Sequence, residues 1–424
     1  MRVLARDAAK HTNKRITLKG WVHRVRELGA ISFVLLRDRS GMIQIVFEGK
    51  TGFTHESVIS VQGTVRENAK APGGVEIQEA SAQVLSAAGS DLPIPVNCGP
   101  EKLSLDAILD NRMISLRMPK ILSVFRVQAT IVGAFADYLR GQDFTEIKTS
   151  KLVGSGTEGG AGLFTVEYFD TKVYLAQSPQ FYKQALVASG LERVFEVGAA
   201  YRAEKHDTAR HLNEYVSLDV EMAFIDSERE LVELEKGILK AVFAAVQKKN
   251  AAELEALDAP PLPGPESVDG IPCVGYDEAR DIISRLGARR VFDINPEGER
   301  ILCDWALQER GVPAVFVNDF PRKKRPVYAY PDGQKTLSFD LLFRGLEITT
   351  GGRRINEYPM MLESLSKFGL SPEGMGAYMD IFRCGCPPHG GFAIGLERLT
   401  QKILGLQNVK EASLFPRDRK RITP

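Results

Sequence analysis

Cysteine is scarce in this chain of 424 residues, which contains five cysteines far apart in the sequence. So few scattered thiols exclude the disulfide framework that stabilises small secreted domains. Apolar runs are short as well, because none approaches the roughly 18 residues that span a bilayer. The first 15 residues are polar and basic, so we find no secretory signal. These absences lead us to expect a protein of the reducing cytoplasm.

Net charge is also small, at +1, but it is unevenly distributed. Residues 1–90 carry an excess of five positive charges, and the remainder carries an excess of four negative charges. A small basic excess can be an ordinary solvated surface. It can equally indicate a surface for a polyanion, because each Lys or Arg that contacts a phosphate strengthens binding. Charge alone leaves both alternatives open.

Residues 1–90 are predicted to form a small β domain. Runs rich in β-branched and aromatic residues lie at 15–26, 31–40 and 41–49. Turn-forming residues separate these runs, and four or five short strands in under about 100 residues are typical of a small barrel. Residues 91–119 begin with many prolines and glycines and predict a linker or hinge.

Residues 120–424 mix helices with strands. Apolar residues at helical spacing predict one helix over 120–141 and a charged amphipathic helix over 227–249. Strand-like runs follow without strict βαβ alternation, so we expect an α+β fold with an antiparallel sheet. The proline-containing segment of about 250–300 is expected to be a peripheral insertion.

Two short motifs are weak. Residues 154–159 match G-x-G-x-x-G, but a strand-like run follows where a dinucleotide fingerprint requires a helix. Cys384 and Cys386 are separated by one residue and have no second pair, so we interpret them as incidental thiols rather than zinc ligands. The chain contains no P-loop pattern, so a phosphate site would have to use side chains or another loop.

Three separated segments place charge within apolar runs. Arg202 and Glu204 are expected on one face of a strand, followed by a charged loop. The loop could be a solvated hairpin tip, but charges inside an apolar strand need a ligand or partner. The second segment contains Asp340 and Glu347, whose carboxylates are hard oxygen ligands suited to Mg²⁺. The third segment places Arg398 at a glycine-flanked turn into a helix. Together they indicate nucleotide chemistry.

At these segments the sequence resembles the class II aminoacyl-tRNA synthetases, most closely the archaeal-type aspartyl-tRNA synthetases. Residues 201–204 resemble motif 2, 390–399 resemble motif 3, and 410–418 resemble the family's C-terminal segment. Residues 120–152 resemble motif 1, which forms the family's dimer interface, although Ser150 stands where proline is usual. The resemblance implies an N-terminal OB-fold barrel that binds the anticodon and a class II catalytic domain.

The resemblance also implies an ATP site, in which Arg202 contacts the α-phosphate, Arg398 the γ-phosphate, and Tyr215 stacks on adenine. The implied ATP-binding residues are Arg202, Glu204, Arg210, His211, Tyr215, Glu347 and Arg398. Arg202, Arg398 and Glu204 are the implied catalytic residues. Mg²⁺ would be held by Asp340, Glu347 and Thr350.

For the amino acid, the resemblance implies that Lys183 and Arg354 bind the side-chain carboxylate of aspartate. Glu158 would lie near the ammonium group, in a loop over 157–160 that closes on the substrate. The implied aspartate-binding residues are Glu158, Ser178, Gln180, Lys183, Arg202, Asp219, Thr350 and Arg354.

On the barrel, the resemblance implies that Phe33 stacks on an anticodon base, Gln44 reads its edge and Arg26 supports the backbone. His23 and Pro72 are similar to the pair found in relatives that charge both tRNA-Asp and tRNA-Asn. Alternatively, His23 is an ordinary surface residue of a strand and Pro72 only forms a turn.

The implied activity is ATP-dependent activation of L-aspartate and its transfer to tRNA by a cytoplasmic homodimer that uses Mg²⁺. An asparaginyl-tRNA synthetase is the nearest alternative, but that family typically lacks the lysine at position 183. A catalytically inactive RNA-binding barrel protein is disfavoured because the ATP-contacting residues are intact. An ammonia-using asparagine synthetase would lack the barrel.

Overall fold

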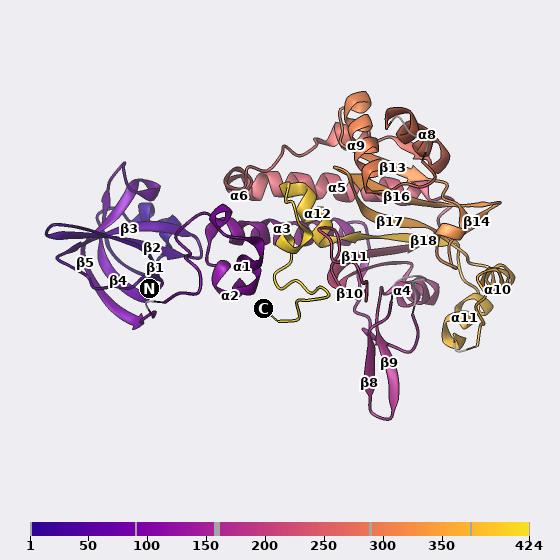
Figure 1. Ribbon diagram of the computed structural model, residues 1–424, viewed down its shortest axis with the longest axis horizontal. Coiled ribbons are helices and arrows are strands. Elements are labelled where there is room, and N and C mark those ends of the chain that lie inside the picture. The colour runs from indigo at the N-terminus through magenta and orange to yellow at the C-terminus, as the bar shows by residue number, and fades with distance from the viewer. Residues whose placement is uncertain (1, 90, 157–161, 288–290, 374, 424) are drawn as a thin grey trace. The chain divides into compact units, whose positions relative to one another are not determined.

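The computed structural model describes residues 2–89, 91–156, 162–287, 291–373 and 375–423. The chain forms two compact units, Met1–Met118 and Pro119–Pro424, which Figure 1 colours from indigo to yellow. The first unit contains the predicted barrel, and the second contains the predicted mixed sheet and its helices.

The first unit is built on a closed barrel with the strand order β1-β2-β3-β5-β4, as predicted. Its strands are β1 (Arg15–Leu28), β2 (Ile31–Asp38), β3 (Gly41–Glu48), β4 (Val58–Glu67) and β5 (Val75–Ser86). Buried and exposed residues alternate along these strands, so their valines, leucines and isoleucines fill the interior. Gly20 is required where β1 approaches β2, because an added Cβ would lie 2.3 Å from the Arg37 carbonyl oxygen.

The segment 91–119, expected to be a linker, belongs to the first unit except for its last residue, and it contains two short helices. They are α1 (Leu105–Asp110) and α2 (Arg112–Ser115). Ser104 caps α1 by accepting a hydrogen bond from the Ala107 amide. Beyond α2, the Arg117 guanidinium lies 3.2 Å from the Glu56 carboxylate beside the barrel.

The second unit contains an eight-stranded sheet with the order β12-β13-β16-β17-β18-β11-β10-β6. Its strands are β6 (Thr145–Glu146), β10 (Arg193–Tyr201), β11 (Glu214–Ala223), β12 (Cys273–Gly275), β13 (Ala314–Asn318), β16 (Ser338–Phe343), β17 (Leu346–Arg354) and β18 (His389–Gly395). All neighbours are antiparallel except the two edge pairs, which confirms the predicted α+β class. Edge strand β12 comes from the segment 250–300 that we expected to be peripheral.

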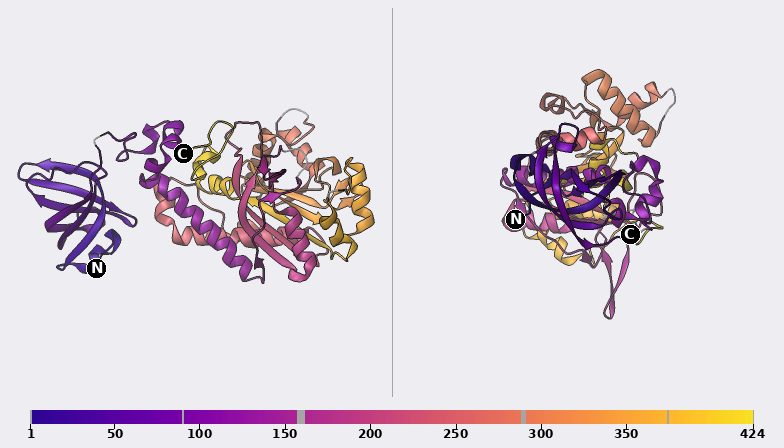
Figure 2. Two further views of the ribbon diagram at one scale, coloured as in Figure 1. Left: turned by 90° about the horizontal axis from the view of Figure 1, so that it is seen from below. Right: turned by 90° about the vertical axis from the view of Figure 1, so that its left-hand side faces the viewer.

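Smaller strands and helices surround this sheet. Two small sheets comprise β7 (Leu152–Val153), β8 (Thr165–Tyr168) and β9 (Thr171–Leu175), and β14 (Pro331–Asp332) and β15 (Lys335–Thr336). The β8–β9 hairpin projects from the second unit in Figures 1 and 2. The helices are α3 (Pro119–Arg140), α4 (Gln180–Leu186), α5 (Arg229–Lys249), α6 (Ala251–Ala256), α7 (Pro265–Asp269), α8 (Tyr276–Leu286), α9 (Pro296–Arg310), α10 (Tyr358–Lys367), α11 (Gly376–Arg383) and α12 (Leu396–Leu404).

Helices α3 and α5 confirm the two helices predicted from spacing, and they pack against each other. By length and composition α3 could cross a membrane, contrary to our expectation that no apolar segment is long enough. Its buried residues, Val127, Ile131 and Phe135 among them, instead join the core cluster that also contains sheet residues. This is the packing of a core helix in a folded domain.

Glu235 on α5 is a carboxyl group buried in this core. It is fully shielded from solvent, and Thr349 of β17 donates a hydrogen bond to its Oε1. Burial raises the pKa of Glu235 from 4.5 to about 8. The folded protein therefore holds this proton at neutral pH, whereas the unfolded chain releases it.

We expect the stability of the protein to fall as pH rises from about 4.5 to about 8, by up to about 1.4 kcal/mol per pH unit, because the folded state binds the Glu235 proton more tightly. Glu235→Gln should flatten this slope, which calorimetric melting from pH 5 to pH 8.5 would measure (roughly the window set by those pKa values). Glu233→Gln, on the exposed side of the same helix, is the control. Parallel slopes for wild type and Glu235→Gln would contradict the assignment.

Candidate active site

Two cavities adjoin over strands β11, β17 and β18, and five residues line both. The shared residues are Arg202, Tyr215, Ser217, Thr350 and Ala393. The first cavity, of about 130 Å³, contains all seven residues expected to bind ATP. The second, of about 730 Å³, contains Lys183 and Arg354 together. A ligand in one cavity can therefore reach a ligand in the other.

The polar lining of the first cavity includes three arginines and three glutamates. The Arg398 guanidinium, from the start of α12, donates to the Glu347 carbonyl oxygen at 3.0 Å and lies 3.6 Å from its carboxylate. Arg202 lies over the Tyr215 ring, with Cζ 5.7 Å from the centroid. Contrary to our prediction, Arg202 and Glu204 do not lie on a strand, because β10 ends at Tyr201. They nevertheless line the same cavity.

Asn213 holds this segment in place after the strand ends. Its side-chain amide donates to the carbonyl oxygens of Arg202 (2.7 Å) and Glu204 (3.1 Å), and the Arg202 amide donates to the Asn213 carbonyl oxygen. The loop after β10 is therefore held by hydrogen bonds from Asn213, at the C-terminal end of the loop, rather than by strand pairing.

His211 is half-buried in this loop. Its Nε2 lies 3.5 Å from the Glu204 carboxylate, and its Nδ1 lies 2.6 Å from the Thr208 hydroxyl. Burial lowers the pKa of His211, the charges of Arg398 and Arg210 lower it further, and Glu204 opposes them. A neutral His211 leaves the arginines as the cations of this cavity.

Arg210 is bound by a residue that sequence reasoning missed. Its Nη2 lies 2.6 and 2.5 Å from the two carboxylate oxygens of Glu299, on α9. Glu299 also accepts a hydrogen bond from the Glu347 amide at 2.9 Å. The segment 250–300 therefore reaches the first cavity, and no local pattern around Glu299 indicated this.

The three expected Mg²⁺ ligands lie on neighbouring strands. Asp340 of β16 is the register partner of Thr350 of β17, and the Thr350 hydroxyl donates to Glu347 at 3.3 Å. Asp340 Oδ2 lies 2.8 Å from Arg325, whereas its buried Oδ1 has no hydrogen-bond partner among the described residues. Burial raises the pKa of Asp340 to about 6, with Arg325 acting against the rise and Glu347 adding to it.

This donor set fits Mg²⁺. Two carboxylates and a hydroxyl are hard oxygen ligands, and Mg²⁺ usually takes its remaining ligands from phosphate and water. The buried Oδ1 of Asp340 is an acceptor for which a cation would supply the missing partner.

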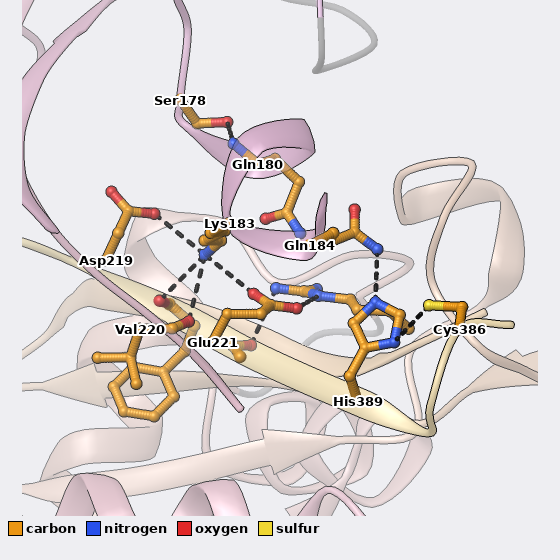
Figure 3. A network of polar contacts seen from close by, with 12 residues as sticks. Ser178, Gln180, Lys183, Gln184, Asp219, Val220, Glu221, Cys386 and His389 are labelled. Atoms are coloured by element: carbon orange, nitrogen blue, oxygen red, sulfur yellow. Dashed lines mark hydrogen bonds and ion pairs between the residues drawn. The ribbon is translucent and has the colours of Figure 1, made fainter. Parts of the chain in front are cut away.

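Lys183 and Arg354 converge on one buried carboxylate in the second cavity. Lys183 Nζ lies 3.2 Å from Glu221 Oε2, and Arg354 Nε lies 3.2 Å from Glu221 Oε1. Lys183 also lies 3.1 Å from Asp219 Oδ1 and donates to the main-chain carbonyl of Val220 (Figure 3). Arg354 Nη2 donates to the Gly391 carbonyl oxygen at 2.9 Å.

Glu221 is fully buried and charged. Burial raises its pKa, but the charges of Arg354 and Lys183 outweigh that effect, so the pKa lies below its usual value. Glu221 offsets one of the two cations, and Asp219, 3.1 Å from Lys183, offsets the other, so the four side chains together carry no net charge. The sequence analysis gave Glu221 no role, although it shares a strand face with Asp219 at i, i+2.

Two polar residues that line the second cavity, Ser178 and Gln180, lie at the start of α4. The Ser178 hydroxyl accepts from the Gln180 amide at 3.4 Å, and Gln180 is buried with no partner for Nε2 among the described residues. A substrate oxygen could satisfy that donor.

Arg325, another residue that sequence reasoning missed, lines the same cavity and follows a basic run. The expected contact Glu158 and its loop over 157–160 lie outside the described residues.

The expected anticodon residues of the barrel lie on adjacent strands. Phe33 of β2 is the register partner of Arg26 on β1 and of Val46 on β3. Gln44 of β3 donates through Nε2 to Glu76 at 2.8 Å, which leaves its amide oxygen as an acceptor. These three side chains are all at least partly exposed, on neighbouring strands of one sheet.

His23 and Pro72 occupy different environments in the barrel. His23 is only 7% exposed, and its Nδ1 lies 3.0 Å from Arg37, which pairs with buried Glu56. Pro72 begins a short 3₁₀ turn, Pro72–Gly74, before β5. His23 is therefore not the surface residue of our alternative interpretation.

Comparisons with known proteins agree with both units. Residues 104–419 match the family described as tRNA synthetases class II (D, K and N). Residues 16–85 match the OB-fold nucleic acid binding domain. The chain is 47% identical to the aspartate–tRNA(Asp/Asn) ligase of Thermus thermophilus, with full coverage of both chains. It is 38% identical to the aspartate–tRNA(Asp) ligase of Pyrococcus abyssi, covering 97% of this chain and 96% of that one.

Solved structures give the same picture. The asparaginyl-tRNA synthetase of Pyrococcus horikoshii, complexed with asparaginyl-adenylate, superposes with a TM-score of 0.93 at 29% identity over the whole of both chains. A putative aspartyl-tRNA synthetase of Leishmania major superposes with a TM-score of 0.90 at 26% identity, covering all of this chain and 95% of that one. The fold is therefore shared between proteins named for different amino acids.

Proposed function

Because this chain belongs to the class II tRNA synthetases of the aspartate, lysine and asparagine group, we propose that it activates L-aspartate with ATP and transfers it to tRNA-Asp and tRNA-Asn. The observation that carries this proposal is the second cavity, where the Lys183 ammonium and the Arg354 guanidinium lie together and converge on Glu221. The relatives named aspartate–tRNA(Asp/Asn) ligase support it.

The chemistry needs alignment of two anions rather than an activated nucleophile. The α-carboxylate of aspartate attacks the α-phosphorus of ATP, and pyrophosphate leaves with the displaced electron pair. Arg202 lines both cavities and would stabilise charge on the α-phosphate, while Arg398 would bind the γ-phosphate. Bound Mg²⁺, held by Asp340, Glu347 and Thr350, would supply further positive charge to the phosphates.

In the second step, the terminal 3′-hydroxyl of tRNA attacks the carbonyl carbon of aspartyl-adenylate, and AMP leaves. Asp219 and Glu158 would pair with the substrate ammonium during both steps. Lys183 and Arg354 would hold the side-chain carboxylate. Two cationic donors match the carboxylate of aspartate better than the neutral amide of asparagine, because hydrogen bonds to an ionised acceptor are stronger.

An asparaginyl-tRNA synthetase is the alternative function, because proteins of that name share this fold. ATP–pyrophosphate exchange with each amino acid separates the two. We expect exchange with aspartate to exceed exchange with asparagine by roughly 10⁴, as polar matching allows. Preference for asparagine would refute the proposed function.

The tRNA range is tested by charging purified tRNA-Asp and tRNA-Asn side by side. We propose similar rates on both, with His23 acting through its contact to Arg37 rather than by touching the anticodon. A preference for tRNA-Asp above about a hundredfold, which corresponds to ~2.7 kcal/mol, would overturn this part of the proposal. We further propose a cytoplasmic homodimer formed through residues 120–152, which light scattering would test.

Gln44→Ala is expected to lower tRNA charging about tenfold and to leave ATP–pyrophosphate exchange unchanged, because Gln44 lies on the barrel and the reacting groups lie in the second unit. Gln62→Ala, an exposed glutamine on β4 of the same barrel, is the matched control. Equal losses in exchange and charging for Gln44→Ala would contradict the proposal that the barrel binds tRNA and the second unit carries out the reaction.

A further inference from the structure

A buried chain of polar side chains lies behind the second cavity. The Tyr378 hydroxyl donates to Gln184 Oε1 at 3.0 Å, and Gln184 Nε2 lies 2.8 Å from His389 Nε2. His389 Nδ1 lies 2.9 Å from the Pro387 carbonyl oxygen. Gln184 and His389 have no exposed surface, and Tyr378 is 7% exposed. None of the three was among the residues expected to bind substrate.

The hydrogen bonds of this chain have one direction. A carbonyl oxygen can only accept, so His389 carries its hydrogen on Nδ1 and Nε2 accepts from the Gln184 amide. The Gln184 oxygen is then free to accept from Tyr378. Burial lowers the pKa of His389, with Arg354 lowering it further and Glu221 opposing, which keeps the ring neutral. In this arrangement both ring nitrogens of His389 and both ends of the Gln184 amide have a hydrogen-bond partner.

The chain joins the elements that carry the two cations. Gln184 follows Lys183 on the seven-residue helix α4. His389 on β18 is the register partner of Arg354 on β17 (Figure 3 shows Gln184, His389 and the Lys183 contacts together). Tyr378 of α11 also stacks on Phe181 of α4, with ring centroids 4.0 Å apart. So α4 is tied to β11 by Lys183 and to β18 by Gln184.

We propose that Gln184, His389 and Tyr378 are positioning residues that fix the separation of Lys183 and Arg354 around Glu221, and thereby the preference for a side-chain carboxylate over an amide. The inference rests on the proposed function, which assigns this cavity to aspartate. A bidentate carboxylate contact depends on donor geometry, so a small displacement of α4 would weaken binding of aspartate more than binding of ATP.

The test measures ATP–pyrophosphate exchange for Gln184→Leu and Tyr378→Phe, with KM determined separately for aspartate, asparagine and ATP. Gln184→Leu removes both bonds of the amide and should raise KM for aspartate about tenfold, while KM for ATP stays within about twofold. Tyr378→Phe keeps the stack on Phe181 and removes one bond, so a rise of about threefold is expected. Preference for aspartate over asparagine should decrease in the same order.

The double variant should resemble Gln184→Leu alone, because Tyr378 acts through Gln184. Ser115→Ala removes a buried hydroxyl donor in the first unit and is the control for loss of any buried hydrogen bond. Should Gln184→Leu not fold, the aspartate KM of Tyr378→Phe decides the question alone.

Equal increases in KM for ATP and aspartate would reduce these residues to a general structural role and overturn the inference. Unchanged aspartate KM in folded variants would do the same while leaving the proposed function intact. A wild-type protein that does not activate aspartate would instead remove the proposed function, and the inference with it.

Discussion

Arg354→Ala is expected to lower kcat/KM for aspartate in ATP–pyrophosphate exchange by about a thousandfold, or ~4 kcal/mol. From the end of β17, Arg354 contacts the Glu221 carboxylate and the Gly391 carbonyl oxygen and lies over the Tyr328 ring. Its removal leaves Lys183 to the carboxylates of Asp219 and Glu221, so the substrate carboxylate would lose its guanidinium partner. The exchange assay at saturating ATP measures this loss.

Arg353→Ala provides a matched control, because Arg353 is the adjacent arginine on β17. It donates to the Asp226 carbonyl oxygen and lies over the Tyr330 ring, outside both cavities. We expect Arg353→Ala to retain activity within a few-fold. Arg354→Lys should recover only part of the activity, because a lysine cannot make the bidentate contact. Similar losses for Arg353→Ala and Arg354→Ala would show that the aspartate cavity is misplaced.

Arg202→Ala should reduce kcat of the exchange reaction by about 10²–10³-fold, because Arg202 lines both cavities and, in the proposed mechanism, stabilises charge on the α-phosphate as the bond forms. The effect should appear in kcat more than in KM, since the contact strengthens in the transition state. Single-turnover formation of the adenylate is the direct measurement.

Arg193→Ala, at the start of β10, which ends one residue before Arg202, is the control for Arg202→Ala. Arg193 donates to the Gln142 carbonyl oxygen and lies over the Phe144 ring, away from the two cavities. It should leave exchange unchanged within a few-fold. If Arg202→Ala lost only the transfer to tRNA and kept normal adenylate formation, its proposed role at the α-phosphate would be wrong.

The regular elements that support these residues were predictable because their signals are local. Helices α3 and α5 follow the helical spacing of apolar residues, and the barrel strands follow runs of β-branched residues. The end of β10 was not predictable in this way. Arg202 and Glu204 continue the residue alternation of the strand. Their carbonyl oxygens nevertheless accept hydrogen bonds from the Asn213 side chain, across the loop, instead of pairing with another strand.

The ion pairs of the site could not be predicted, because their partners are distant in sequence. Arg210 and Glu299 are 89 residues apart, and Arg354 and Glu221 are 133 residues apart. Nothing near either residue indicates which charge will face it. The same holds for His23, whose burial against Arg37 depends on the bulge that shifts the register between β1 and β2.

The amino-acid sequence by itself determined which chemical groups are available: arginines for phosphates, hard oxygen ligands for a cation, and two basic residues for an acidic substrate. The order of these residues along the chain and the spacing around them are local properties of the sequence, so the resemblance to a family can be recognised from them. Only the tertiary structure decided which charges neutralise each other, because pairing depends on sheet register and on helices that return from elsewhere in the chain. Lys183, Arg354 and Glu221 illustrate this, since the two cations identified from the sequence converge, on folding, on one buried carboxylate.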